Sequence, residues 1–282
     1  MIERLQRSWE LTLQCLGVLR EDKSLLLFPF FSGIALLLIM ASFALPLWPL
    51  LTSLASRSGR AADHTLPVIL LFLFYFIQFS VMNFFNTALV EVALRRFDGQ
   101  HATVGDGLRR ACARLPVILM YSAVAATVGT VLRLIEERVG FIGRIVVALI
   151  GVVWAVATGL VVPVIAAEDV GPFEAITRSG ELIRKAWGEE IIGNAGIGVV
   201  FGLVIGVVVV GGGLALTGAF AASVSLGIVL FVFLVVAVVL LLLAQTTLQG
   251  IYAAALYRYA DGDAATGGLD PALLGDAFHA RG

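Results

Sequence analysis

The chain has 282 residues, of which 60% are hydrophobic and only 14% are charged, and its mean hydropathy is +0.99. Soluble domains carry about 25% charged residues, so this composition excludes a water-soluble globular protein. The net charge of −1 conceals an uneven distribution of charge along the chain, which is informative about topology.

Six apolar stretches account for more than half of the chain. They cover about 25–45, 66–90, 115–134, 145–166, 191–217 and 223–258. The hydrocarbon core of a bilayer is about 30 Å thick, and a helix needs about 20 mostly apolar residues to cross it. We therefore predict an all-α membrane protein with six transmembrane helices, and we interpret the first stretch as a retained span rather than a cleaved signal peptide.

The basic residues predict the orientation of these spans. Of the 19 Lys and Arg residues, 14 lie in the N-terminal segment, the second-to-third and fourth-to-fifth connections, and the tail. Because basic residues accumulate on the cytoplasmic side, we predict that both termini are cytoplasmic. The excess of Arg over Lys suggests a high-GC prokaryotic genome, so we expect the protein in a prokaryotic cytoplasmic (inner) membrane.

The chain shows an internal repeat of three units. Similar stretches precede the first, third and fifth spans, at 8–17, 105–114 and 179–188. Leu11, Leu108 and Leu182 coincide in this alignment. Each unit is predicted to be a cytoplasmic interfacial amphipathic helix followed by a transmembrane hairpin. The repeats cover about 1–103, 104–173 and 174–262 of a transmembrane domain at 1–262, and 263–282 is predicted to be a cytoplasmic tail, flexible or forming a short helix.

The third interfacial helix has the clearest pattern. Pro172 suits its first turn, where the missing N–H is not needed. An apolar stripe at helical spacing consists of Phe173, Ile176, Gly180, Ile183 and Trp187. Such helices either lie among lipid headgroups or fill the space beneath the bundle, and both interpretations stay open. The expected lipid contacts are Trp9, Arg109, Arg110, Arg184, Lys185 and Trp187.

The same region carries a family resemblance. Residues 168–175 read EDVGPFEA and are followed by Arg178-Ser179 and Trp187-Gly188, while Ser8-Trp9 and Phe28-Pro29 occur earlier. This pattern resembles a family of uncharacterised six-span prokaryotic membrane proteins, a domain of unknown function that is distantly similar to the membrane domain of glycerophosphodiester phosphodiesterases. The resemblance implies the six-span layout and brings no catalytic residues.

Polar side chains within the spans form two rows. One row on the second span and one on the sixth form a candidate polar seam: Tyr75, Gln78, Asn83, Asn86, Gln245, Gln249 and Tyr252. The seam either provides hydrogen bonds between helices or lines a path for a small solute. We favour hydrogen bonding because no acid or base lies in the middle of a span. Glu91 near the cytoplasmic end is either a residue at the mouth of such a path or solvated.

Small residues recur every four positions on three spans. These faces are Ser122, Ala126 and Thr130 on the third span, Gly151, Ala155 and Gly159 on the fourth, and Gly198, Gly202 and Gly206 on the fifth. Small residues at this spacing let helix backbones approach closely in lipid, so we predict packing inside one bundle, with a dimer face as the alternative. We expect Gly211–Gly213 to end or loosen the fifth helix.

No arrangement of residues in the sequence indicates an enzyme. The histidines lie outside the spans, and Asp98-Gly99 only begins an alcohol-phosphatidyltransferase motif whose later residues are missing. We expect no catalytic residues, no metal and no cofactor. The prediction is a non-enzymatic membrane protein that binds lipid or a partner protein, with membrane lipids and another membrane protein or a second copy as partners, and no nucleic acid. The alternative is a transporter or channel that uses the seam.

Overall fold

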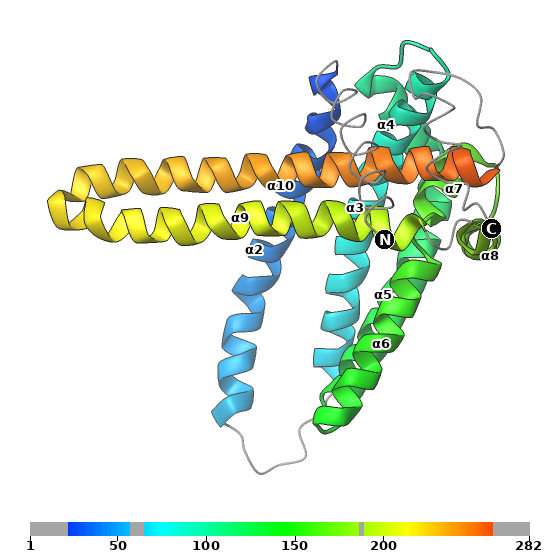
Figure 1. The fold of residues 1–282 in the computed structure, drawn as a ribbon. Coiled ribbons are helices and arrows are strands. Elements are labelled where there is room, and N and C mark those ends of the chain that lie inside the picture. Colours follow the sequence, from blue (N-terminus) through cyan, green and yellow to red (C-terminus); the bar gives the residue numbers. More distant parts are fainter. Residues whose placement is uncertain (1–21, 57–64, 186–188, 262–282) are drawn as a thin grey trace.

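The computed structural model describes residues 22–56, 65–185 and 189–261, and every regular element in these ranges is a helix. Figure 1 shows their arrangement. The elements are η1 (Lys23–Leu26), α2 (Leu27–Ser56), α3 (Thr65–Phe97), α4 (Val104–Ala113), α5 (Leu115–Glu136), α6 (Phe141–Ala157), α7 (Val161–Ala167), α8 (Pro172–Lys185), α9 (Glu189–Ala222) and α10 (Val224–Asp261).

Six helical segments within the described ranges are long and apolar enough to cross a membrane, in agreement with the predicted number of candidate spans. They are Lys23–Ala44, Val68–Phe97, Leu115–Glu136, Phe141–Ala167, Ile197–Ala222 and Val224–Asp261. The shortest has 22 residues. At about 1.5 Å per residue this gives about 33 Å, enough for a hydrocarbon core of about 30 Å.

Consecutive long helices contact each other: α2 with α3, α5 with α6, and most extensively α9 with α10. In Figure 1 the helices α2, α3, α5 and α6 run in similar directions, whereas the α9–α10 hairpin crosses them and extends well beyond them. The hairpin therefore does not run parallel to the other four long helices. The threefold repeat stays a prediction.

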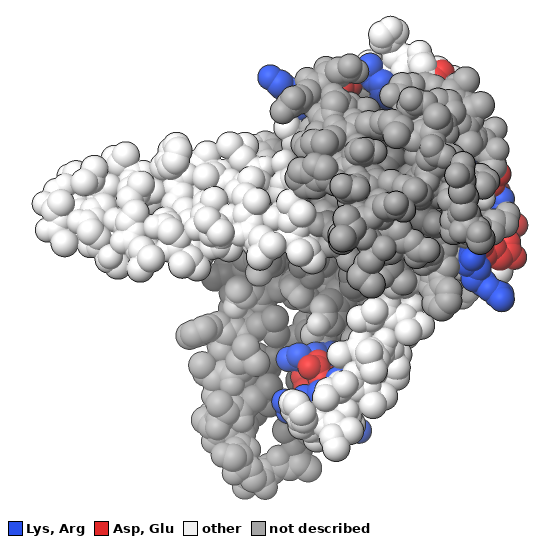
Figure 2. All heavy atoms as spheres, in the orientation of Figure 1, with Lys and Arg blue, Asp and Glu red and all other residues white. Residues whose placement is uncertain are grey.

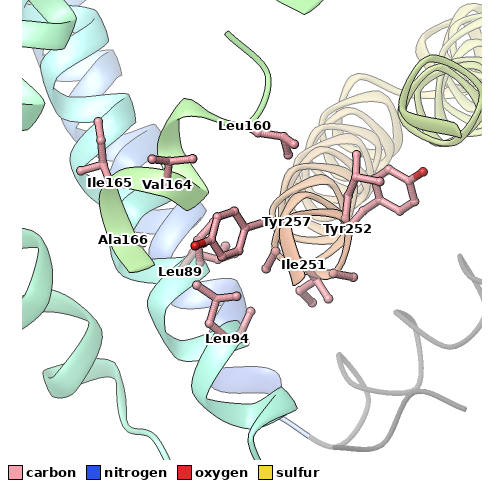
Figure 3. Close-up of a cluster of buried hydrophobic side chains, with 14 of the residues drawn as sticks. Leu89, Leu94, Leu160, Val164, Ile165, Ala166, Ile251, Tyr252 and Tyr257 are labelled. Atoms are coloured by element: carbon pink, nitrogen blue, oxygen red, sulfur yellow. The ribbon is translucent and has the colours of Figure 1, made fainter. Parts of the chain in front are cut away.

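The buried core lies at one end of the long helices, in a region that we call the head. The head consists of residues 22–28, 88–118, 158–184 and 248–261. Figure 3 shows Leu89 and Leu94 of α3, Val164 and Ile165 of α7, and Ile251 of α10 around a common cluster. Burying each large aliphatic side chain contributes about 1.5–3 kcal/mol relative to exposure to water. The head thus joins segments that are far apart in the sequence.

Outside the head, apolar side chains face away from the protein. The exposed fractions reach 80% at Phe141 of α6, 72% at Val207 of α9 and 70% at Phe233 of α10. The α9–α10 hairpin shows no charged residue on the face drawn in Figure 2, and residues 197–243 contain none. An apolar surface of this extent is typical of contact with lipid or with another membrane helix.

Two sequence predictions about individual helices are wrong. The fourth span is not one helix, because α6 ends at Ala157 and α7 begins at Val161. Pro163 has no N–H, and its ring clashes with the carbonyl four residues earlier, at Gly159, so a continuous helix is disfavoured. In contrast, α9 continues through Gly211–Gly213 to Ala222. A glycine in a helix is less favourable than alanine by up to about 1 kcal/mol. In the absence of water, however, the backbone N–H and C=O groups find their hydrogen-bond partners most readily within the helix itself.

Helix α4 packs on α3 at backbone distance. A Cβ placed on Gly107 would lie 2.4 Å from the carbonyl oxygen of Ala88 and 2.8 Å from Cγ2 of Val92, whereas one on Gly105 meets only the Thr103 hydroxyl at 3.6 Å. A capping box between Thr103 and Asp106 starts the helix. The hydrogen bonds from Thr103 hold the pKa of the Asp106 carboxyl below its usual range, so the carboxylate form of the cap persists in mild acid.

We predict that Gly107→Ala destabilises the protein by about 1–3 kcal/mol, because the methyl group forces α4 away from the α3 backbone. Gly105→Ala is the matched control in the same helix. There the gain in helix propensity, up to about 1 kcal/mol, should leave the protein as stable as or more stable than the wild type. Thermal unfolding in detergent measures both. Equal melting temperatures for the two variants would contradict close packing of α4 on α3.

Candidate functional site

The short helix α7 lies at the centre of the head, in contact with α3, α8 and α10. Five of its seven residues are buried: Val161, Pro163, Val164, Ile165 and Ala166. Figure 3 shows this helix close to the cluster formed with α3 and α10. A helix of seven residues is not stable by itself, because nucleation is costly and few bonds follow it. Contacts at its two ends and along its sides must therefore hold it in place.

The N-terminal end of α7 is joined to α6 through a side chain of α8. The hydroxyl of Ser179, which is completely buried, donates to the carbonyl oxygen of Ala157 at 2.9 Å. It also accepts the backbone N–H of Leu160 at 3.1 Å. These are backbone groups at the break between the two helices. Ser179 therefore supplies hydrogen bonds that the interrupted helix cannot make internally.

The C-terminal end of α7 is held by a side chain of α4. Arg110 donates from Nε to the carbonyl oxygen of Ala166 at 2.8 Å and from its terminal nitrogen to that of Ala167 at 3.2 Å. The last carbonyls of a helix have no partner within it, and they carry the negative end of the helix dipole. A guanidinium satisfies both requirements. Arg110 therefore caps α7, and its predicted contact with lipid stays a prediction.

Charged groups after α7 connect it with α8 and α10. Glu168 accepts a hydrogen bond from Arg178 at 3.3 Å and one from the Tyr257 hydroxyl at 3.0 Å. Arg178 also pairs with Asp261 at 2.6 Å. Although partial burial lowers the pKa of Arg178, the hydrogen bond and charge of Glu168 raise it overall, so the guanidinium remains charged. This cluster fixes the end of α10 beside α8.

Further ion pairs connect other ends of the long helices within the head. They are Asp22–Arg96, Glu91–Arg95, Glu91–Arg110, Asp98–Arg258 and Asp169–Arg114. Glu91 is only 7% exposed and lies 2.6 Å from Arg95. Glu91 is therefore not solvated, which contradicts one of the two interpretations from the sequence, and its place at the mouth of a path stays a prediction. Its carboxylate is buried beside two guanidinium groups, which compensates for the loss of water.

The residues of the candidate seam have different surroundings. Asn83 is buried and donates to the Ser122 hydroxyl of α5 at 3.0 Å, so its side chain faces α5. Tyr75 stacks on Phe79 of its own helix. Gln78, Asn86, Gln245 and Gln249 are half-buried, and Tyr252 is buried. The contact between α3 and α10 agrees with the predicted proximity of the two rows, but a seam shared by all seven residues stays a prediction.

Sequence reasoning missed a second group of buried polar side chains. Tyr121 of α5 and Thr158 at the break after α6 are both buried, and Tyr121 is next in sequence to Ser122, which accepts the hydrogen bond from Asn83 of α3. The spacing of small residues on α5 indicated a packing face and gave no role to the hydroxyl groups on it. The signal was the combination of Tyr121 and Ser122 with Pro163, a residue that marks a break in the next span.

The small-residue faces also differ from one another. On α5, Ser122, Ala126 and Thr130 are buried, as packing requires. On α6, a Cβ at Gly151 would touch Leu132 at 3.9 Å, and Ala155 is exposed, while Gly159 is half-buried in the turn after α6. A Cβ at Gly198, Gly202 or Gly206 of α9 would meet no described atom within 4 Å. No partner for this face is found among the described residues of the chain, where a Cβ at Gly212 of α9 would meet Leu234 of α10.

The structure describes only some of the other residues predicted to lie at the membrane interface. Arg109 and Arg184 are exposed on α4 and α8. Trp9 and Trp187 lie outside the described residues, as does the side chain of Lys185. Within the described ranges no group of three His, Cys, Asp or Glu residues is arranged to hold a metal ion.

We predict that Ser179→Ala destabilises the protein by about 1–3 kcal/mol, since it leaves a buried carbonyl and a buried N–H without partners. Thr177→Ala is the matched control in α8, because this exposed hydroxyl bonds only the carbonyl of its own helix at Phe173. Thermal unfolding in detergent compares them. Equal effects of the two substitutions would show that Ser179 does not secure the break between α6 and α7.

Comparison with known proteins places this architecture in a family. No curated protein and no solved structure matches the chain, and the expected similarity to the membrane domain of glycerophosphodiester phosphodiesterases is not shown. A family model described as a family of unknown function (DUF6159) matches residues 65–268. This range includes five of the six spans and most of the head, so the chain belongs to that family of unknown function.

Proposed function

We propose that this chain is a non-enzymatic, multi-pass membrane protein that binds a membrane helix, from a partner protein or a second copy, through its α9–α10 hairpin. The observation that carries the proposal is the open face at Gly198, Gly202 and Gly206 of α9. The proposed location is a prokaryotic inner membrane with both termini cytoplasmic, where membrane lipids surround the other long helices.

The geometry of the open face favours a helix over lipid chains. The three glycines share one face because four residues advance about 400° on a helix. Without Cβ atoms, another backbone can approach closely enough for dispersion and weak Cα–H···O contacts. Lipid chains offer no carbonyl groups for such contacts. An open glycine face within a span is therefore better matched by a second helix.

The absence of charged residues on the hairpin limits the kind of partner that can bind it. Residues 197–243 contain no Asp, Glu, Lys or Arg, and the hairpin shows none on the face drawn in Figure 2. A soluble protein would have to desolvate its own polar surface against this hairpin without compensation. An apolar transmembrane helix has no such cost. The partner is accordingly another membrane-embedded segment.

The position of the helix ends supports the proposed topology. The start of α2, the end of α3, the start of α5, α7 and the end of α10 meet in the head. This is the side to which an even number of spans returns the chain. The basic residues Arg95, Arg96, Arg110, Arg114 and Arg258 lie there. Accumulated basic residues favour the cytoplasmic side.

The alternative function is a transporter or channel with a path between α3 and α10. In its favour, Gln78, Asn86, Gln245 and Gln249 are half-buried on helices that contact each other. Against it, Asn83 bonds Ser122 on another helix. Hydroxyls of the spans bond their own backbones, as Thr87 does to Asn83 and Thr247 to Leu243. Polar groups committed in this way do not bind a passing solute.

The decisive substitution is Gly202→Leu, whose side chain should prevent close approach of a helix. The matched control is Val207→Leu, at a residue 72% exposed and about 140° away around the same helix. We expect Gly202→Leu to reduce self-association or co-purification of a membrane partner at least tenfold, with an unchanged melting temperature of the isolated chain. Light scattering in detergent and quantitative co-purification measure these effects.

Two results would contradict the proposal. A lower melting temperature for Gly202→Leu alone would place the contact within the chain. Identical association of Gly202→Leu, Val207→Leu and the wild type would remove the glycine face from binding altogether.

A separate experiment tests the transport alternative. Purified protein in liposomes should give no solute flux above that of empty liposomes, because Asn83 is bonded to Ser122 and the hydroxyls of Thr87 and Thr247 are bonded to their own helices. Flux that is present for the wild type and lost on Gln245→Leu, but retained on Thr246→Ala at the neighbouring exposed hydroxyl, would favour a path along α10 and contradict the binding role.

A further inference from the structure

We propose that the junction between α4 and α5 binds the phosphate group of an anionic phospholipid, and that Arg114 is the residue that holds it. This goes beyond the binding of a helix by the hairpin, because it concerns a different ligand at the other end of the long helices. The proposal rests on the contacts of Arg114 and on its position directly before a candidate span.

Arg114 lies at the boundary of the third span. It stands between α4, which ends at Ala113, and α5, which begins at Leu115. The candidate span Leu115–Glu136 starts at the very next residue. Basic residues directly outside a span lie at the level of the lipid headgroups and are attracted by anionic lipids. A lipid phosphate therefore reaches this level without leaving the membrane surface.

The guanidinium of Arg114 is buried and incompletely paired. The residue is only 8% exposed, and its Nε finds no hydrogen-bond acceptor among the described residues. Its ion pair is with Asp169, whose side chain is 93% exposed. Removing a positive charge from water is costly unless anions and hydrogen bonds compensate for it. One carboxylate that is itself in water compensates only in part, so Arg114 retains capacity for a stronger anion.

The surroundings of Arg114 favour an anion at this junction. Residues 104–120 carry three Arg and one Asp. Arg110, one turn before Arg114, also faces the end of α7, where it donates to two carbonyl groups. The first N–H groups of α5 form the positive end of a helix dipole, and the Arg114 side chain does not cap them. Phosphate suits these donors because a guanidinium can bond two of its oxygens at once.

The outer face of α5 provides an apolar surface for the lipid chains. Leu115 is 40% exposed and Leu119, one turn further along the same face, is 37% exposed. A phospholipid with its phosphate at the junction can place its acyl chains along this face. Inorganic phosphate gains nothing from apolar side chains. The site therefore suits a lipid better than a free phosphate ion.

Asp169 occupies the position on Arg114 that the phosphate would take. It lies in the connection between α7, which ends at Ala167, and α8, which begins at Pro172. An ion pair to an exposed carboxylate is weak, so another anion exchanges with it readily. The proposal thus predicts that loss of the Asp169 charge strengthens lipid binding, whereas loss of the Arg114 charge weakens it.

The test measures the dissociation constant of the first bound lipid. The purified full chain in neutral detergent is titrated with phosphatidylglycerol, and bound lipid is counted by native mass spectrometry. We expect Arg114→Gln to weaken binding about tenfold, as the loss of a charge-assisted hydrogen bond does. Arg184→Gln is the matched control, because Arg184 is exposed on α8, and it should leave the constant unchanged.

A second pair of variants tests the role of Asp169. We expect Asp169→Asn to strengthen binding about threefold, because a weak competing ion pair is removed. Glu174→Gln removes the same charge from an exposed position on α8 and should have no effect. If Arg114→Gln does not fold, Arg114→Lys replaces it, and the loss of the planar fork should still weaken binding.

Three outcomes would overturn the phosphate site. Equal effects of Arg114→Gln and Arg184→Gln would show that lipid is attracted only by overall charge. Unchanged or weaker binding by Asp169→Asn would show that this carboxylate does not occupy the site. Displacement of the lipid by an equal concentration of inorganic phosphate would show that the acyl chains play no part. None of these results depends on the hairpin, so this site and the proposed binding function can fail separately.

Discussion

The structure depends on satisfying the backbone of the interrupted fourth span. In hydrocarbon or in a dry protein interior, an unpaired carbonyl or N–H has no water to bond, so a break in a helix is tolerated only beside suitable side chains. Ser179 supplies such groups at the start of α7, and Arg110 supplies them at its end. Each comes from a short helix outside the spans. The break therefore determines where α8 and α4 must lie.

The placement of α4 and α8 in turn explains why the head is the only extensively buried part of the described chain. Helix α4 covers the end of α3 and α8 covers α7 and the end of α10, and their apolar side chains complete the cluster that includes Leu182 and Ile251. The ion pairs at the periphery are individually weak where they are exposed. They set the register between helix ends, such as Asp98 with Arg258, rather than supply most of the stability.

The sequence was sufficient for features that depend on one segment at a time. Six helices followed from the length of the apolar stretches, and the start of α8 at Pro172 followed from the tolerance of proline in a first turn. Features that depend on contacts between two segments could not be predicted from the sequence. The bond between Asn83 and Ser122 joins residues 39 positions apart. Nothing in the periodicity of either helix favours α5 over α10 as the partner of Asn83.

The break in the fourth span could be predicted from the sequence only in part. Pro163 was visible in the sequence, but prolines are tolerated in membrane helices when neighbours compensate. Whether the helix kinks or breaks depends on those neighbours, and Ser179 and Arg110 come from distant parts of the chain. At Gly211–Gly213 the sequence predicted that the helix ends or loosens, but α9 continues through these residues. Glycine disfavours a helix locally, yet without water the backbone groups have no hydrogen-bond partners other than those within the helix.

Helix α10 connects the two parts of the molecule that have different surroundings. Its 38 residues extend about 57 Å, well beyond the hydrocarbon thickness of about 30 Å. The first half is largely exposed and apolar, as at Phe233, whereas the second half, from Thr247 on, is mostly buried in the head. At Gly250 an added Cβ would lie 2.5 Å from Cδ2 of Leu89, so α10 meets α3 without room for a side chain. Because the helix is uninterrupted, its packing against α3 in the head sets the direction of the whole hairpin. For the hairpin to align with the other long helices in a bilayer, either this contact must change or α10 must bend beyond it.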